Sequence, residues 1–574
     1  MKKLILATAV AAAFAGQAQA FTAVAVPLTG AGTPNWTAIN AAGKTEGYIT
    51  GSSAATPFLE EALRSECNTS VSPVYKIADS TNSAFVYVCS NAGTNANLTT
   101  PYLVMHKRDG GGSINALKNA NGTLQFFVNE ATAPNVTACQ TGAAVVGAIS
   151  NCTGGTVSLA TTGQLADVGF SDVDSAQFSS ASNGSVNIAG LTNTSMATEI
   201  FGVAVSLNLR NAMQTVAVAA GVLPTGCATG NSVPGALRES EACMPNLTTS
   251  QVSTLFANNG FGSWANVAYD NLDGGADLYN GTATANAAEP NGSTVHICAR
   301  TPGSGTWATL NIKFENAPCN GNNDEAFVTS SVKNTIGQES ADGVKVIHSM
   351  NGASDVDACL DALNNGVAEG TFTPYPTLAP SPAATGTSNS RYAIAVQGVD
   401  RNANLAKNYR FIKVDNVSPS AYNVVNGRWK LWSEMVAVSK GPLPTSPLIT
   451  DIVTLIKDPL HIANLDALVG TTIAAGTGVN PGATALTGVQ SWGQVSGFLG
   501  SALGASGPTS YTPSTTGGSA TLLNAAFDPS RPVNPYTHAT SKGTNLNHCR
   551  VPTIPNAADP ANNPAEMPAF YGKY

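Results

Sequence analysis

Two hydrophobic patterns alternate along the chain. Short runs rich in β-branched and aromatic residues predict strands, whereas apolar residues three or four positions apart predict amphipathic helices. The strand-like runs include 85–88, 201–205, 295–297 and 392–396, and the helix-like stretches include 58–63 and 249–256. This alternation predicts an α/β fold.

The pattern weakens beyond Ser439. The chain there becomes rich in Pro, Gly, Thr and Asn and keeps only short helical candidates at 449–456 and 462–468. Such a composition is typical of turns and loops. We therefore expect residues 439–574 to form an irregular C-terminal extension.

The first residues have the features of a secretory signal peptide. Lys2 and Lys3 precede an apolar run over 4–16, which ends in the small-residue sequence 18–20. We expect cleavage after Ala20. No cysteine follows for lipid attachment, and no later stretch approaches the roughly 20 apolar residues of a membrane span. The sequence thus predicts a soluble protein of the periplasm or the extracellular space.

Composition narrows the class of partner. The 574 residues carry a formal net charge of -8, which disfavours nucleic acid and anionic membranes as partners. A few oriented amides and one arginine can still bind a small anion in a cleft. The ten cysteines form an even set without a C-x-x-C motif, so disulfides are expected in an oxidising compartment. Neighbouring cysteines suggest the pairs Cys67–Cys89, Cys139–Cys152 and Cys227–Cys243, although the spacing leaves other connectivities open.

The most specific local motif is the segment from Arg300 to Thr306. It follows a predicted strand and precedes apolar residues at helical spacing, so a glycine turn leads into a helix N-terminus. The free amides there favour an anion, Ser304 and Thr306 can donate hydroxyl hydrogen bonds, and Arg300 can form a fork with two oxygens. The alternative is an ordinary strand-to-helix turn with a surface arginine.

Two further segments suggest the same chemistry. In 51–61 two serines stand just before a helix that Pro57 can begin, although such a segment by itself is more often a simple helix cap than a ligand site. In 167–172 a strand of small residues ends in Asp172, whose alternative role is a solvated turn. A carboxylate accepts a hydrogen bond only from a protonated oxyanion, so Asp172 would favour phosphate over sulfate.

Together these segments resemble, in order, the motifs of the phosphate-binding component of phosphate ABC transporters, a periplasmic-binding-protein family of the second type. Residues 51–58 resemble the family's first serine loop, 167–172 its D-F-G-A-S-D and 300–306 its R-x-D-G-S-G-T. Further likenesses lie, in the same order as in the family, at 246–266, 392–396 and 415–431. The resemblance implies two α/β lobes that hold phosphate between them without a metal or another cofactor.

The resemblance also implies the binding residues and the domain boundaries. The implied phosphate ligands are Ser53, Ala54, Ser113, Asp172, Arg300, Ser304, Gly305 and Thr306. The implied boundaries are a signal peptide at 1–20, a first lobe at 21–199, a second lobe at 200–390, a returning part of the first lobe at 391–438, and the extension at 439–574.

The chain departs from the family pattern in three places. Ile114–Asn115–Ala116 follows Ser113 where the family has glycine and small residues, and Pro302 replaces an acidic residue. The chain is also longer, with inserted cysteine-bearing loops. The anion pocket can be retained despite such changes even where docking to a transporter is lost.

Three functions remain open. The first is a phosphate receptor for an ABC-type permease, and the second is a secreted or surface protein that uses the fold for scavenging, adhesion or assembly. The third, a phosphatase-like enzyme, is disfavoured because the six histidines show no metal-ligand spacing. The bound oxyanion could also be one other than phosphate.

Overall fold

The structure of the chain is a computed structural model. The structure describes residues 24–79, 84–108, 113–120, 122, 125–126, 136–142, 145, 148–154, 164–180, 183–230, 236–257, 260–267, 278, 293–317, 319, 339–341, 345–366, 390–402, 405–420, 423–424, 427–443, 446–458, 498–501, 533–534, 536–539, 546–555 and 564–565. The expected signal peptide and the helix expected at 462–468 lie outside these residues.

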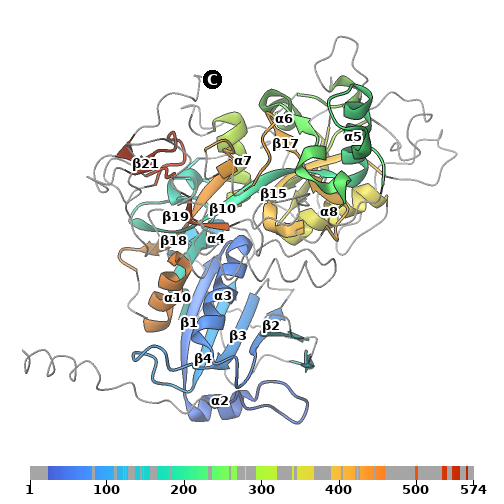
Figure 1. Ribbon diagram of the computed structural model, residues 1–574. Helices are drawn as coiled ribbons and strands as arrows, with labels where there is room; N and C mark the ends of the chain where they lie inside the picture. The colour runs from blue at the N-terminus through green and yellow to red at the C-terminus, as the bar shows by residue number, and fades with distance from the viewer. Residues whose placement is uncertain are drawn as a thin grey trace, which may run out of the picture.

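The described chain forms two α/β lobes joined by one long strand (Figure 1). Strand β10 (Leu191–Ser206) runs through both lobes. Its first half pairs with β18 (Trp432–Lys440) in lobe 1, and its second half pairs with β15 (Ala393–Gly398) and β16 (Tyr409–Phe411) in lobe 2. The two-lobed α/β fold predicted from the sequence is therefore confirmed.

Lobe 1 contains a mixed sheet covered by helices. Its order from the centre outward is β10, β18, β9, β1, β4, β3, β2, β7 and β6. The strands are β1 (Lys44–Gly51), β2 (Val74–Asp79), β3 (Ala84–Ser90), β4 (Tyr102–Arg108), β6 (Ala138–Cys139), β7 (Ile149–Thr153) and β9 (Val168–Ser171). The helices of this lobe are α2 (Trp36–Ala42), α3 (Thr56–Glu66), α4 (Ser113–Ala120) and α10 (Pro447–Lys457).

Lobe 2 repeats part of this order. In lobe 2 the parallel strands β14 (Val346–Met350), β12 (His296–Arg300) and β15 are followed by antiparallel β10 and then by β16. In lobe 1 the parallel strands β4, β1 and β9 are followed in the same way by antiparallel β18 and then by β10. The remaining strands are β13 (Glu339–Ala341) and the pair β11 (Asn246–Leu247) with β17 (Lys413–Val414). The helices are α5 (Leu207–Ala219), α6 (Thr249–Phe256), α7 (Gly305–Glu315) and α8 (Ala353–Asn365).

Each lobe has its own hydrophobic core. In lobe 1, buried Phe58, Leu59 and Leu63 of α3 pack against one face of the sheet, and Ile39 of α2 packs against the other. In lobe 2, the apolar second half of β10 and the whole of β15 are buried, as expected for strands covered on both faces. Within the described residues, no helix is long and apolar enough to cross a membrane.

Five disulfides stabilise this arrangement. The suggested pairs Cys67–Cys89, Cys139–Cys152 and Cys227–Cys243 are confirmed. Two more pairs, Cys298–Cys359 and Cys319–Cys549, join segments that lie far apart in the sequence.

Two expected boundaries need correction. Residues 391–438 do not return as a whole to the first lobe, because β15 and β16 pair with β10 inside lobe 2 and only β18 returns. The region after Ser439 is not only an appendage. Helix α10 lies beside α3 in the lobe 1 core (Figure 1), and β19 (Phe498–Ser501) pairs with β10. Ile449, Ile452 and Ile456 recur at helical spacing, which accounts for the burial of one face of α10.

Removing a buried side chain from α10 tests its place in the core. Ile452 is fully buried, so Ile452→Ala should lower the free energy of unfolding by about 2–5 kcal/mol. Thr454→Ala, at an exposed position of the same helix, should change it by less than about 0.5 kcal/mol. The measurement is urea denaturation of the mature protein. Equal small effects from both variants would contradict the assignment of α10 to the core.

Candidate anion-binding site

The segments expected to bind an anion all begin where parallel strands end. Strand β1 leads into 52–56, β4 precedes α4, β9 leads into Asp172, and β12 leads through 301–304 into α7. The carboxyl ends of parallel strands meet at one edge of a sheet, where α/β proteins commonly bind ligands. Lobe 1 contributes the first three segments and lobe 2 the fourth.

The first segment turns sharply at Gly51. Its φ of 123° is in the left-handed region, and a Cβ there would lie 2.0 Å from the Phe170 carbonyl oxygen, so a side chain is excluded. The next residue, Ser52, donates its N–H to the same Phe170 oxygen, which fixes this loop beside β9. Ser52 Oγ also accepts a hydrogen bond from the Ala54 N–H, so this predicted ligand amide has a partner within the chain.

Asp172 lies at the centre of the site. Its side chain is buried, and its backbone N–H donates a 3.1 Å hydrogen bond to Ser113 Oγ at the start of α4. A Cβ on Gly305 would lie 2.4 Å from Asp172 Cβ and 2.5 Å from Asp172 Oδ2, so glycine is required where α7 meets this aspartate. Asp172 of lobe 1 therefore contacts the N-terminus of a lobe 2 helix.

Burial and neighbouring donors act in opposite directions on Asp172. Desolvation raises the pKa of its carboxyl, while the Ser52 hydroxyl, the positive charges of Arg300 and Lys107 and the Thr306 N–H all lower that pKa. Asp172 Oδ1 has no hydrogen-bond partner among the described residues. One oxygen of the carboxyl group is therefore available to an incoming ligand.

Arg300 is buried at the end of β12. Its Nε donates to the Asn351 carbonyl oxygen at 3.1 Å, and Nη1 lies 3.5 Å from Thr306 Oγ1. These contacts orient the guanidinium beside the first turn of α7. Burial lowers the pKa of Arg300, and the opposite charge of Asp172 is the largest influence against this shift.

The departure from the family pattern after Ser113 has a structural explanation. The Ile114 N–H donates to the Gly303 carbonyl oxygen at 2.8 Å, and the Ile114 side chain lies against Gly303 and Gly184. Ile114 thus forms a direct contact between the start of α4 in lobe 1 and the loop before α7 in lobe 2.

Three hydroxyls of this region have no hydrogen-bond partner among the described residues. They are Ser53 Oγ, Thr56 Oγ1 and Ser304 Oγ, and all three oxygens are buried. Buried hydroxyl groups normally find a partner, because their desolvation is otherwise uncompensated. Ser53 follows Ser52, Thr56 ends the short helix that Ser52 caps, and Ser304 precedes Gly305. The unpaired donors therefore belong to the segments that surround Asp172.

The structure adds charged residues that the sequence reasoning missed. Lys107, in β4, donates to the Ser52 carbonyl oxygen at 3.1 Å, and burial lowers its pKa to about 7. Glu199 of β10 is buried close enough to Asp172 and Arg300 to interact electrostatically with both. Its pKa is raised well above the usual value, first by burial and then by the charges of Asp172 and Asp400. The one sequence feature that could have indicated Lys107 is its position near the end of a strand, before the Gly-rich stretch 110–112. No local sequence feature indicates Glu199.

The geometry therefore brings Asp172, Ser113, Arg300, Gly305 and Thr306 together by direct or electrostatic contact, with Ser304 in the adjoining turn. Ser53 and Ala54 lie in the short 3₁₀ helix η1 (Ser53–Ala55), next to Ser52. Among the described residues, the site thus offers amide, hydroxyl and guanidinium donors from both lobes and one buried carboxyl acceptor.

Comparison with known proteins finds likenesses to solved structures at low sequence identity. No family model matches the chain, and no curated protein matches it. Similar solved structures include a phosphate ABC transporter substrate-binding protein from Clostridium perfringens with bound phosphate, at 13% identity and a TM-score of 0.36, with 74% of this chain and 97% of that chain covered.

Two further structures are similar. PstS from Borrelia burgdorferi is 10% identical with a TM-score of 0.29, over 74% of this chain and 97% of that one. An ABC-type phosphate transport receptor from Vibrio cholerae is 11% identical with a TM-score of 0.29, over 76% of this chain and 98% of that one. Such distant likenesses carry no information about the ligand of the present chain, which has to be inferred from its own site.

The raised pKa of Glu199 predicts a pH dependence of stability. Above its ordinary pKa of 4.5 the unfolded glutamate loses its proton while the buried one keeps it, so the native state binds more protons and the free energy of unfolding falls as pH rises. Glu199→Gln removes this loss, which is at most about 1.4 kcal/mol per pH unit. Urea denaturation from about pH 5 to about pH 8 should show the variant gaining stability relative to the wild type. If the difference in free energy of unfolding between Glu199→Gln and the wild type does not change with pH, Glu199 is not protonated in the native state.

Proposed function

We propose that this chain is an exported solute-binding protein that holds a tetrahedral oxyanion, inorganic phosphate, between its two lobes. The observation that supports this proposal best is the convergence of donors from both lobes around Asp172 and Arg300. Buried hydroxyls of Ser53, Thr56 and Ser304 without partners among the described residues add to it. Dehydrating phosphate is costly, so a site for it needs a donor at nearly every oxygen.

Each group has a distinct role in this proposal. The amides of Gly305 and Thr306 and the dipole of α7 favour negative charge, and Arg300 supplies a full positive charge. Ser53 and Ser304 donate hydroxyl hydrogen bonds. Ser113 Oγ accepts from the Asp172 N–H, so its role is to position the aspartate.

Asp172 gives the site its selectivity. A carboxylate can accept a hydrogen bond from a protonated phosphate oxygen, whereas sulfate at neutral pH has no proton to donate and is repelled. Asp172 also reaches the Thr306 N–H of lobe 2, so a bound anion and Asp172 share the donors of α7.

Binding rather than catalysis follows from this donor set. The groups around Asp172 bind and orient an anion, and contacts to both lobes favour the closed arrangement. Location in the periplasm or outside the cell and release of phosphate to an ABC-type permease are parts of the same proposal.

Calorimetric titration tests the ligand directly. Mature protein, unfolded and refolded with its disulfides intact to remove bound anion, should bind phosphate but not sulfate. Arg300→Ala should weaken phosphate binding roughly 100-fold or more, because charge-assisted hydrogen bonds are lost. Asp172→Asn should narrow the preference over sulfate, because an amide can donate to either anion.

Arg428→Ala is the matched control, because Arg428 is an exposed arginine of lobe 2 distant in sequence from the site. It should bind phosphate like the wild type. Absence of phosphate binding by the correctly folded wild type would falsify the proposal. Equal effects of Arg300→Ala and Arg428→Ala on phosphate affinity would exclude Arg300 from the binding site.

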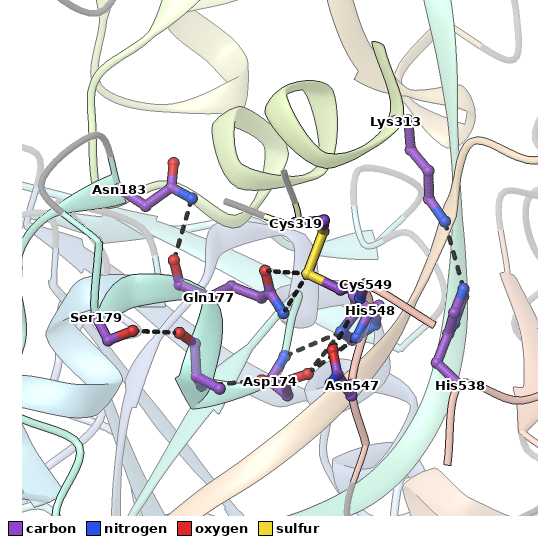
Figure 2. Close-up of a disulfide and its surroundings, with 11 residues drawn as sticks. Asp174, Gln177, Ser179, Asn183, Lys313, Cys319, His538, Asn547, His548 and Cys549 are labelled. Atoms are coloured by element: carbon purple, nitrogen blue, oxygen red, sulfur yellow. Dashed lines mark hydrogen bonds and ion pairs between the residues drawn. A yellow bond between two sulfur atoms is a disulfide. The ribbon is translucent and has the colours of Figure 1, made fainter. Parts of the chain in front are cut away.

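A second candidate function is retention or scavenging of the anion outside the cell without transport. The observation that favours it is the C-terminal segment that joins both lobes. Figure 2 shows Cys549 bonded to Cys319 just beyond α7 of lobe 2, and the adjacent His548 in contact with Asp174 of lobe 1. His548 also accepts a hydrogen bond from the Glu434 N–H of lobe 1. This connection, a disulfide to lobe 2 and hydrogen bonds to lobe 1, limits how far the lobes can separate.

The two candidates differ in the rate of ligand release. If the connection limits opening, the double variant Cys319→Ser/Cys549→Ser should release phosphate faster than the wild type, with the binding residues unchanged. Stopped-flow dissociation of labelled phosphate measures this rate. The variant Cys227→Ser/Cys243→Ser lacks a disulfide within lobe 2 and is the control. Unchanged release in the first variant would argue against the retention function.

A further inference from the structure

A second buried polar cluster lies at the junction between the C-terminal segment and strand β18. Glu434 of β18, His538 and His548 each offer one ligand atom, and these three atoms lie within 4.8 Å of one another. All three side chains are fully buried. His538 and His548 come from the region expected to be an irregular extension. Figure 2 shows the His548 ring near Asp174 and the His538 ring near Lys313.

His548 is oriented as metal-binding histidines usually are. Its Nε2 accepts a 3.2 Å hydrogen bond from the Glu434 N–H, so the ring proton lies on Nδ1 and points to Asp174 Oδ2 at 3.0 Å. A carboxylate on the far nitrogen fixes the tautomer, and a metal ion would bind Nε2 by replacing its hydrogen bond from the Glu434 N–H. Asp174 is itself held as the cap of the short helix η3 (Ser175–Phe178).

His538 presents an unsatisfied nitrogen to the same point. Its Nδ1 is buried and makes no hydrogen bond to any described residue, and it lies 3.6 Å from Glu434 Oε2. Two ligand atoms about 2.1 Å from a tetrahedral zinc ion are about 3.4 Å apart, so this spacing already suits a shared metal. An unpaired buried imidazole nitrogen is otherwise a cost to folding.

Glu434 is held in place by donors from the same segments. Its Oε1 accepts hydrogen bonds from Thr537 Oγ1 at 2.7 Å and Ser501 Oγ at 3.3 Å, and Oε2 accepts from the His538 N–H at 3.0 Å. The carboxylate is thus fixed by hydrogen bonds while facing both imidazoles. This support is the kind that orients a metal-ligating carboxylate.

We propose that Glu434, His538 and His548 form a zinc-binding site that fastens the C-terminal segment to strand β18. Two imidazoles and one carboxylate form a ligand set that zinc accepts with water in the fourth position. His548 borders a cavity of about 240 Å³, also lined by Lys313 and Trp432, which gives an ion a route to the cluster. The proposal does not depend on the anion site.

The charges around the cluster set the affinity. Lys313 Nζ lies 3.4 Å from His538 Nε2, and Arg550 also acts on His538, so these two cations oppose a metal ion. The carboxylates of Glu434 and Asp174 favour it. Replacing the cation by Lys313→Met should therefore tighten zinc binding, which a purely structural role of the cluster does not predict.

The test uses the mature protein with its disulfides intact, treated with a chelator and then titrated with zinc and, separately, with cobalt. Calorimetry should give one zinc per chain, and cobalt should give the intense visible bands of a four-coordinate ion. His538→Gln should weaken zinc binding roughly 100-fold or more, and Asp174→Asn about 10–100-fold.

His106→Gln is the matched control. His106 is also a buried histidine beside a glutamate, with its Nε2 3.2 Å from Glu46 Oε1, but it lies in the lobe 1 sheet. This variant should bind zinc like the wild type. Circular dichroism establishes whether each variant is folded.

Two results would overturn the proposal. One is a folded wild type that takes up no zinc or cobalt at one ion per chain, and the other is equal zinc affinity of His538→Gln and His106→Gln. If His538→Gln does not fold, X-ray absorption on the zinc-loaded wild type decides the matter, because two imidazoles with oxygen ligands support the site and any other set excludes it.

Discussion

The rest of the interlobe site depends on one buried carboxylate. Removing the Asp172 charge from water is costly, and the structure compensates with the Ser52 hydroxyl, the Thr306 N–H and the positive charges of Arg300 and Lys107. These groups come from three separate segments. Because two of them belong to lobe 2, the need to compensate one aspartate of lobe 1 holds the N-terminus of α7 against the other lobe.

The same geometry explains why glycine and small residues recur in these loops. At Gly51 a side chain would collide with the backbone of β9, and at Gly305 it would collide with Asp172 itself. The close approach of the helix N-terminus to a carboxyl group is possible only without a Cβ. The loops are therefore selected for close contact as much as for chemistry.

The sequence predicted the elements that have a local pattern. Helix α6 spans Thr249–Phe256, the same residues as the predicted stretch, because a capping box begins it and three apolar positions face the core. The motif residues Asp172, Arg300 and Gly305 lie close together, because the segments that carry them lie at strand ends. What could not be predicted depends on contacts between distant segments. Helix α10 was recognised as a helix, but nothing in its own residues indicates that α3 covers it. Glu199, in the middle of an apolar strand, and Glu434, with His538 and His548 more than a hundred residues further on, have no spacing that marks them as neighbours.

The order of the disulfides has a consequence for how the protein matures. Three pairs join cysteines that are consecutive in the chain, but Cys298–Cys359 and Cys319–Cys549 interleave. Oxidation in the order in which the cysteines occur along the chain would join Cys298 to Cys319 first. Reaching the native pairs from there takes thiol–disulfide exchange, and the last bond cannot form before Cys549 has been synthesised. Biogenesis of this protein therefore favours a compartment with disulfide-isomerising activity, and a chain truncated before Cys549 leaves Cys319 without its native partner.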